Sequence, residues 1–65
     1  MYYIRYKTKR GGSGLSVITT QTTLQNEVLK LFKNKQQARI EKDNIIIGEV
    51  YKQDGRWQWY LDIEA

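Results

Sequence analysis

One stretch constrains the fold more than any other, namely the amphipathic segment Leu24–Phe32. Its apolar residues follow the i, i+4, i+7, i+8 spacing that places side chains along one stripe of a helix; they are Leu24, Val28, Leu31 and Phe32. A single helix cannot bury such a stripe by itself, and the rest of the chain alternates like strands. We therefore predict one helix that packs on a sheet.

The ends of this helix are predicted from its flanking residues. Thr22 is the preferred N-cap because Gln25, three residues later, completes a capping box, and Thr23 is a near alternative. Asn34 suits the left-handed conformation that commonly follows the last helical turn.

The segment before the helix predicts a hairpin with a glycine-rich turn. Strict alternation over Met1–Lys9 predicts a strand whose inner residues are Tyr2, Ile4, Tyr6 and Thr8. The turn is placed at Gly11–Gly14, because glycine adopts positive φ freely. A second strand, Leu15–Thr20, is expected to pair Val17 with Thr8 and Thr19 with Tyr6, so that Leu15, Val17 and Thr19 face inward.

The segment after the helix predicts a strand over Gln37–Glu41, with Ala38 and Ile40 inward, and another over Ile45–Lys52. Two connections between them are possible. A two-residue turn at Asp43-Asn44 pairs Ile40 with Ile47, whereas a three-residue loop pairs Ile40 with Ile46. We prefer the second, with Asn44 left-handed beside a bulge. This choice directs Ile46 inward, and Ile45 and Ile47 outward.

Asp54-Gly55 is the strongest turn signal in the chain. A two-residue loop there predicts three strand pairs, namely Val50 with Trp59, Gly48 with Leu61, and Ile46 with Ile63. Trp59 is then expected to be buried against the helix stripe. Gly48 is expected to leave space for the indole rings or for the helix.

These elements predict an α+β fold with the order ββαβββ, in which one amphipathic helix packs on a single antiparallel sheet. Residues 1–65 form a single small domain, since the chain is too short for two. The strands at Leu15–Thr20 and Gln37–Glu41 are short and polar, which favours edge positions. The last strand carries two Trp residues, which favours the centre. The expected spatial order is therefore second, first, fifth, fourth and third strand.

Composition excludes several functional classes. The chain has no Cys and no His, so we expect no disulfide, no zinc finger, no metal and no His-based or thiol catalysis. Glu49 and Asp62 are carboxylates of the last hairpin, but a small sheet offers no cleft for acid–base chemistry. We therefore expect no enzyme and no cofactor. The net charge of +4 is a mild bias that suits an anionic partner.

The basic, glycine-rich segment Lys9–Gly14 has two interpretations. Its amides and two cations could cradle a phosphate, although the P-loop pattern is absent. A flexible hairpin tip is the preferred interpretation. The Gly11-Gly12-Ser13-Gly14 tetrad also resembles an engineered linker.

The strongest candidate site is the sheet face turned away from the helix. The predicted registers gather there Tyr3, Arg5, Lys7, Arg39, Ile45, Ile47, Tyr51, Gln58 and Tyr60. Such a face fits a protein partner or a second copy of the chain, because Tyr, Ile and Arg are common at protein interfaces. Cations interleaved with tyrosines also fit nucleic acid, which is the alternative. The two outward isoleucines favour protein contact, and thus a small non-catalytic binding module or homodimer.

In length, in Lys- and Ile-rich composition and in its helix-on-sheet plan, the chain resembles small accessory proteins of phages and prophages. The resemblance implies a protein that binds and modulates a host protein. No motif carries it, so it implies no site residue. We expect a cytoplasmic location, because Met1–Thr8 lacks the apolar core of a signal peptide and no apolar run could span a membrane.

Overall fold

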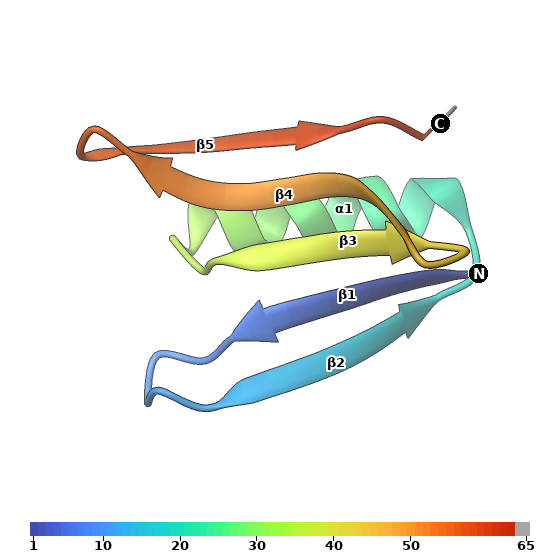
Figure 1. Cartoon of the computed structure of the whole chain (residues 1–65), viewed down its shortest axis with the longest axis horizontal. Helices are drawn as coiled ribbons and strands as arrows, with labels where there is room; N and C mark the ends of the chain where they lie inside the picture. Colours follow the sequence, from blue (N-terminus) through green and yellow to red (C-terminus); the bar gives the residue numbers. More distant parts are fainter. Residues whose placement is uncertain (64–65) are drawn as a thin grey trace.

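A five-stranded antiparallel sheet carries one helix on one of its faces (Figure 1). The computed structural model describes residues 1–63. Its elements in chain order are β1 (Tyr2–Lys7), β2 (Ser13–Ile18), α1 (Gln21–Lys33), β3 (Ala38–Lys42), β4 (Ile45–Gln53) and β5 (Arg56–Leu61). The predicted α+β class and the order ββαβββ are confirmed.

The strand order is β2-β1-β3-β4-β5, so the expected order was wrong. The first strand pairs with β3 and not with β5. Polar residues on β3 do not mark an edge here, because Ala38 and Ile40 are buried on the inner side. On the other side, Glu41 of β3 forms an ion pair with Arg5 of β1, with 2.9 Å between Arg5 Nε and Glu41 Oε1. The alternating polar residues of β3 therefore indicate that one face of this central strand is exposed, and they do not indicate an edge position.

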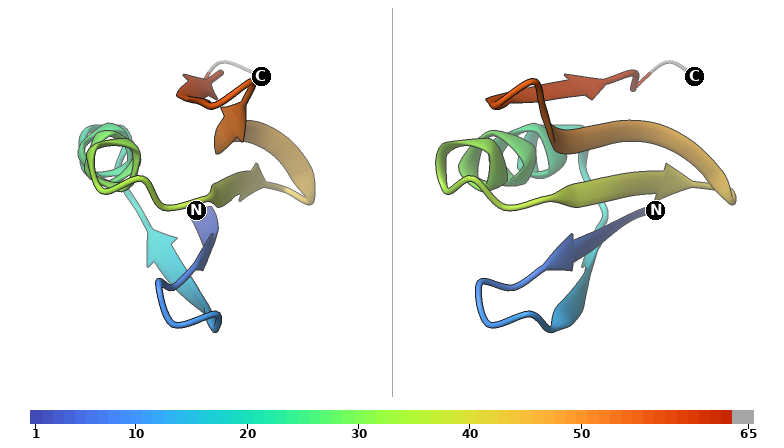
Figure 2. Two further views of the ribbon diagram at one scale, coloured as in Figure 1. Left: turned by 90° about the vertical axis from the view of Figure 1, so that its left-hand side faces the viewer. Right: turned by 60° about the vertical axis from the view of Figure 1, so that its left-hand side comes forward.

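The core lies between α1 and the helix-bearing face of the sheet. Leu24 and Val28 of the helix stripe are fully buried, Leu31 is buried and Phe32 is half-buried, as the spacing predicts. The sheet contributes Tyr2, Ile4, Ala38, Ile40, Ile47 and Val50. The end-on view in Figure 2 shows the helix on one side of the sheet and no helix or strand on the other. Within residues 1–63, no helix is long and apolar enough to cross a membrane.

Trp59 is only partly buried, which corrects the prediction of a buried indole. Its side chain lies on the helix-bearing face, where its ring centroid is 6.5 Å from that of Phe32, but it remains 41% exposed. The cause is the strand order, since β5 is an edge strand and has a neighbour on one flank only.

The helix begins two residues earlier than the preferred N-cap predicts. Thr20, not Thr22 or Thr23, is the N-cap, and its Oγ1 accepts a hydrogen bond from the backbone N–H of Thr23 at 3.3 Å. The left-handed residue at the other end is Lys35, with φ of 56°, whereas Asn34 has φ of −86°. The N–H of Gln36 bonds the carbonyl of Leu31, and that of Lys35 bonds Phe32. These two bonds define a Schellman motif.

Lys35→Gly is expected to stabilise the protein by about 1 kcal/mol, because a non-glycine residue in the left-handed region is strained by roughly that amount. The substitution changes an exposed side chain and leaves the backbone bonds in place. A urea denaturation series would measure it, with Lys30→Gly, an exposed position inside the helix, as the control that should be destabilising. A loss of stability in Lys35→Gly would contradict the assigned helix end.

The β1–β2 register differs from the prediction and exchanges the faces of the second strand. Tyr3 pairs with Val17 and Arg5 with Leu15, so Leu15 and Val17 face away from the helix. The loop is tighter than expected. The N–H of Gly11 bonds the carbonyl of Thr8 at 3.1 Å, and Gly11 carries the positive φ of 86°. Such a three-residue loop, with a left-handed glycine at its end, fixes the pairing of the strands.

The connection between β3 and β4 combines features of both alternatives. Asp43 and Asn44 both have positive φ, and Lys42 pairs with Ile45, so the turn has two residues and the preferred three-residue loop was wrong. A bulge then shifts the register, and Ile40 pairs with Gly48. The bulge is needed because Ile47 and Val50 are three residues apart and both face the core, whereas side chains of a regular strand alternate between faces.

This bulge places Ile47 in the core together with Val50, which corrects the outward placement of Ile47. Ile47 is 2% exposed, whereas Ile46, predicted to be inward, is 47% exposed. Ile45 pairs with Lys42, whose Nζ lies 5.7 Å from the centroid of the Tyr2 ring on the helix-bearing side. The side chain of Ile45 is exposed at the end of that side.

The last hairpin was predicted best. The pairs Val50 with Trp59 and Gly48 with Leu61 are confirmed, and Asp54 and Gly55 both have positive φ. The third pair is wrong, because the pairing ends at Leu61 and the N–H of Asp62 bonds the carbonyl of Ile47 at 2.7 Å. Gly48 leaves room for the backbone of β5, not for an indole ring or the helix, since a Cβ there would lie 2.7 Å from the carbonyl oxygen of Tyr60.

Candidate binding surface

We call the sheet surface opposite the helix the outer face. The strand pairings place on it Leu15 and Val17 of β2, Tyr3, Arg5 and Lys7 of β1, Arg39 and Glu41 of β3, Ile46, Glu49 and Tyr51 of β4, and Gln58 and Tyr60 of β5. No other element that the structure describes covers this face (Figure 2). It is therefore an exposed surface on which all five strands present side chains together.

Seven of the predicted site residues lie on the outer face, namely Tyr3, Arg5, Lys7, Arg39, Tyr51, Gln58 and Tyr60. Ile47 is in the core and Ile45 lies on the other side, so neither belongs to it. Sequence reasoning missed Leu15, Val17 and Ile46. A signal for Ile46 was present in the sequence. Asp and Asn favour a two-residue turn, and such a turn at Asp43-Asn44 pairs Ile46 with Glu41 on the outer face.

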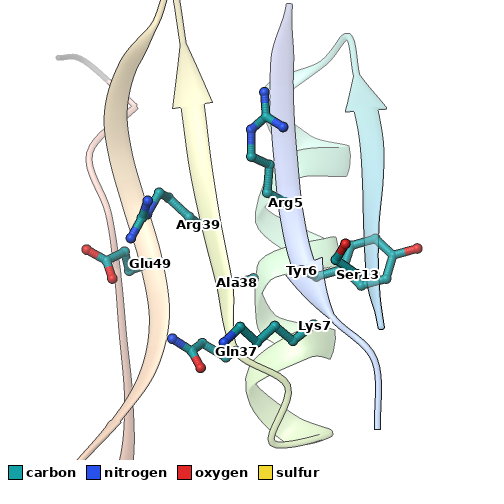
Figure 3. A pocket seen from close by; sticks show the side chains of 8 residues that line it. All are labelled: Arg5, Tyr6, Lys7, Ser13, Gln37, Ala38, Arg39 and Glu49. Atoms are coloured by element: carbon teal, nitrogen blue, oxygen red, sulfur yellow. The ribbon is translucent and has the colours of Figure 1, made fainter. Parts of the chain in front are cut away.

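A shallow hollow of about 270 Å³ opens on this face between β1, β3 and β4. Three cationic side chains line it, Arg5 and Lys7 from β1 and Arg39 from β3. Figure 3 shows Arg39 extending toward Glu49 on β4, and Lys7 lying beside Gln37 at the lower end. The excess of cations makes the hollow attractive to an anionic group.

The charges of the hollow are only partly compensated. Arg5 and Arg39 are direct cross-strand partners, but their side chains extend in different directions, Arg39 toward Glu49 (Figure 3). Arg5 pairs with Glu41, and within residues 1–63 this is the one ion pair. Lys7 and Arg39 therefore keep their charge available at the surface. A ligand carboxylate or phosphate would accept charge-assisted hydrogen bonds from these two cations.

An aromatic pair lies on the outer face across β4 and β5. The rings of Tyr51 and Tyr60 meet edge to face with centroids 6.4 Å apart. The hydroxyl of Tyr51 donates to Gln58 Oε1 at 3.2 Å, and that of Tyr60 donates to Glu49 Oε1 at 3.3 Å. Partial burial raises the pKa of Tyr60, and the neighbouring Glu49 carboxylate raises that pKa further. Tyr60 therefore stays a hydroxyl donor at neutral pH.

The hydrogen bonds of the glycine-rich turn argue against its interpretation as a phosphate cradle. The N–H of Gly11 bonds the carbonyl of Thr8, and the N–H of Gly12 bonds Thr8 Oγ1 at 3.0 Å. A cradle needs such amides to be directed at a ligand.

Residues 1–63 contain no group of three acidic, His or Cys side chains that could hold a metal ion. The outer face carries cations, the carboxylates of Glu41 and Glu49, tyrosine hydroxyls and apolar side chains. Comparisons of this chain with protein-family models, with curated proteins and with solved structures found no match.

Proposed function

We propose that the protein is a non-catalytic binding module whose outer face holds an acidic segment of another protein. The observation that carries the proposal is the cationic hollow of Arg5, Lys7 and Arg39 in the uncovered face. An acidic segment would place carboxylates beside Lys7 and Arg39, which form no ion pair within residues 1–63.

Apolar side chains around the hollow favour a protein ligand over a simple anion. Tyr3 and Ile46 flank Glu41 on the outer face and Tyr60 lies on β5, and all three are exposed. Aromatic and aliphatic contacts supply most of the affinity at protein interfaces, while charges at the rim select the partner and speed association. Ile46 is the isoleucine that the outer face offers for such a contact, whereas Ile47 is buried in the core.

Nucleic acid is the second candidate, because cations and tyrosines share the face. Against it, Glu41 and Glu49 interrupt the row of cations across the sheet. Each carboxylate repels a nearby phosphate and reduces the gain from counterion release. An acidic peptide can place its own charges selectively, whereas a phosphate backbone presents them at a fixed spacing.

Arg39→Ala and Ile46→Ala discriminate between the two candidates. Against a synthetic peptide of alternating Glu and Leu, each variant is expected to weaken binding by about threefold to fivefold, typical of exposed charge pairs and partly buried aliphatic contacts. Against a mixed-sequence single-stranded oligonucleotide, only Arg39→Ala should matter. Lys33→Ala, on the exposed part of α1, is the matched control and should alter neither affinity.

Isothermal titration or fluorescence anisotropy at two salt concentrations measures these affinities. The proposal expects the peptide to bind and the oligonucleotide to bind weakly. Tight oligonucleotide binding that falls steeply with salt and is indifferent to Ile46→Ala would contradict it and favour nucleic acid.

A further inference from the structure

The terminal strand β2 presents an edge without the usual protection against pairing. It ends the sheet on one side, and Figure 1 shows no element beyond it. Natural edge strands are commonly protected by charged residues, by proline or by bulges. The strand Ser13–Ile18 has no charged residue and no proline, and its register with β1 is continuous.

The absence of charge extends well beyond the strand. No charged residue occurs between Arg10 and Glu27, although 28% of the chain is charged. The opposite edge strand differs, since β5 begins at Arg56 and is followed by Asp62. The two edges of the sheet are thus unequal, and β2 is the one suited to accept another strand.

Two apolar side chains of β2 are exposed to solvent. Leu15 is 51% exposed and Val17 is 50% exposed, both on the outer face. A strand added beside β2 would cover part of both, because directly opposed side chains on paired strands contact each other. Backbone hydrogen bonds and apolar burial would then act together.

We infer that β2 pairs antiparallel with β2 of a second copy of this chain, so that two sheets join into one. A second copy fits because the pairing is self-complementary about a two-fold axis. With Ser16 on the axis, Leu15 stands opposite the partner's Val17, and Val17 stands opposite the partner's Leu15. Both pairs lie on the outer face.

The charge distribution is compatible with the same occupant. Two copies of a chain with net charge +4 repel each other. Pairing through β2 brings together the segment without charges and keeps the cations of both copies away from the axis. A register shifted by one residue would place Leu15 and Val17 opposite inner-face residues, so the alternation excludes it. The inference concerns the sheet edge and is independent of the ligand proposed for the outer face.

Light scattering coupled to size-exclusion chromatography tests the pairing. We expect the wild-type chain to reach twice its mass of 7.7 kDa with rising concentration. Leu15→Lys and Val17→Lys are expected to raise the dissociation constant of the dimer by about tenfold or more, through like charges near the axis and lost apolar burial. Circular dichroism checks that these exposed substitutions leave the fold intact.

Ile46→Lys is the matched control, because Ile46 is an exposed aliphatic residue of the outer face away from β2. It should leave the dimer unchanged. A wild-type chain that remains monomeric at every concentration would overturn the inference. So would a dimer that Ile46→Lys disrupts while Leu15→Lys does not, since that pattern indicates contact through the face.

A single cysteine tests the register independently of dimer stability. The chain has no Cys, so Ser16→Cys carries one thiol. Opposed residues of an antiparallel pair lie about 4.5–5.5 Å apart between Cα atoms, within the range of a disulfide. We expect rapid oxidation of Ser16→Cys to a covalent dimer and slow oxidation of Gln53→Cys, at the far end of β4. Equal rates in the two variants would contradict pairing about Ser16.

Discussion

Ile47→Asp is expected to unfold the protein, whereas Ile46→Asp leaves it folded. Ile47 is 2% exposed and belongs to the core, while its neighbour is 47% exposed on the outer face. Truncating a buried isoleucine alone costs about 2–5 kcal/mol, and a buried carboxylate without a partner costs more. A domain of this length has a total stability of roughly 3–10 kcal/mol, at about 0.05–0.15 kcal/mol per residue.

Circular dichroism and denaturant titration of the two variants measure this difference. Each variant places the same charge at adjacent positions of β4, so the chemistry is matched and only the side of the sheet differs. A folded Ile47→Asp together with an unfolded Ile46→Asp would exchange the two sides and contradict the bulge between β3 and β4.

Gly48→Ala is expected to destabilise the protein by about 2–3 kcal/mol, the upper part of the usual range for inserting a methyl group into a packed site. Its Cβ would lie 2.7 Å from the carbonyl oxygen of Tyr60 and 2.9 Å from Leu61 Cδ1. The first of these is a backbone atom of β5, so relief requires movement of a whole strand.

Gly12→Ala is the control for Gly48→Ala. Gly12 lies in the exposed β1–β2 loop, where a Cβ would approach only the Thr8 side chain, at 3.2 Å. Its expected cost is well below that of Gly48→Ala. Denaturation midpoints compare the two, and equal midpoints would mean that β5 does not approach β4 as closely as the structure places it.

Local patterns predicted the parts of the fold that depend on neighbouring residues. The stripe through Leu24 and Val28 needed only helical spacing, and the pairing of Val50 with Trp59 needed only the Asp54-Gly55 turn. Both signals operate over a few residues of the chain.

The strand order was not predictable in the same way, because the pairing of β1 with β3 joins strands on either side of the helix. The buried pair that joins the two strands, Ile4 opposite Ile40, links residues far apart in the sequence. In the same way, Ile47 reaches the core through a bulge that reconciles the Asp43-Asn44 turn with inward Val50. Regular alternation after this two-residue turn could bury Ile47 or Val50, but not both.

The candidate surface was predicted where alternation was regular. Arg5, Lys7 and Arg39 were placed correctly on the outer face because β1 and β3 alternate strictly around buried residues. Leu15 and Val17 were misplaced because the glycine-rich loop permitted several registers. Alternation predicts that the apolar residues of a strand face the core. Only the pairing with β1 shows that Leu15 and Val17 lie on the exposed face instead.

The most direct test of a binding role for the outer face is a nuclear magnetic resonance titration with the Glu-Leu peptide. The predicted result is a set of shift changes at Ile46, at the Arg39 side chain and around Tyr60, with the exposed side of α1 unaffected. Changes centred on α1, or on the half-exposed Trp59 and Phe32 of the helix-bearing side, would contradict the claim that this protein binds through the outer face of its sheet.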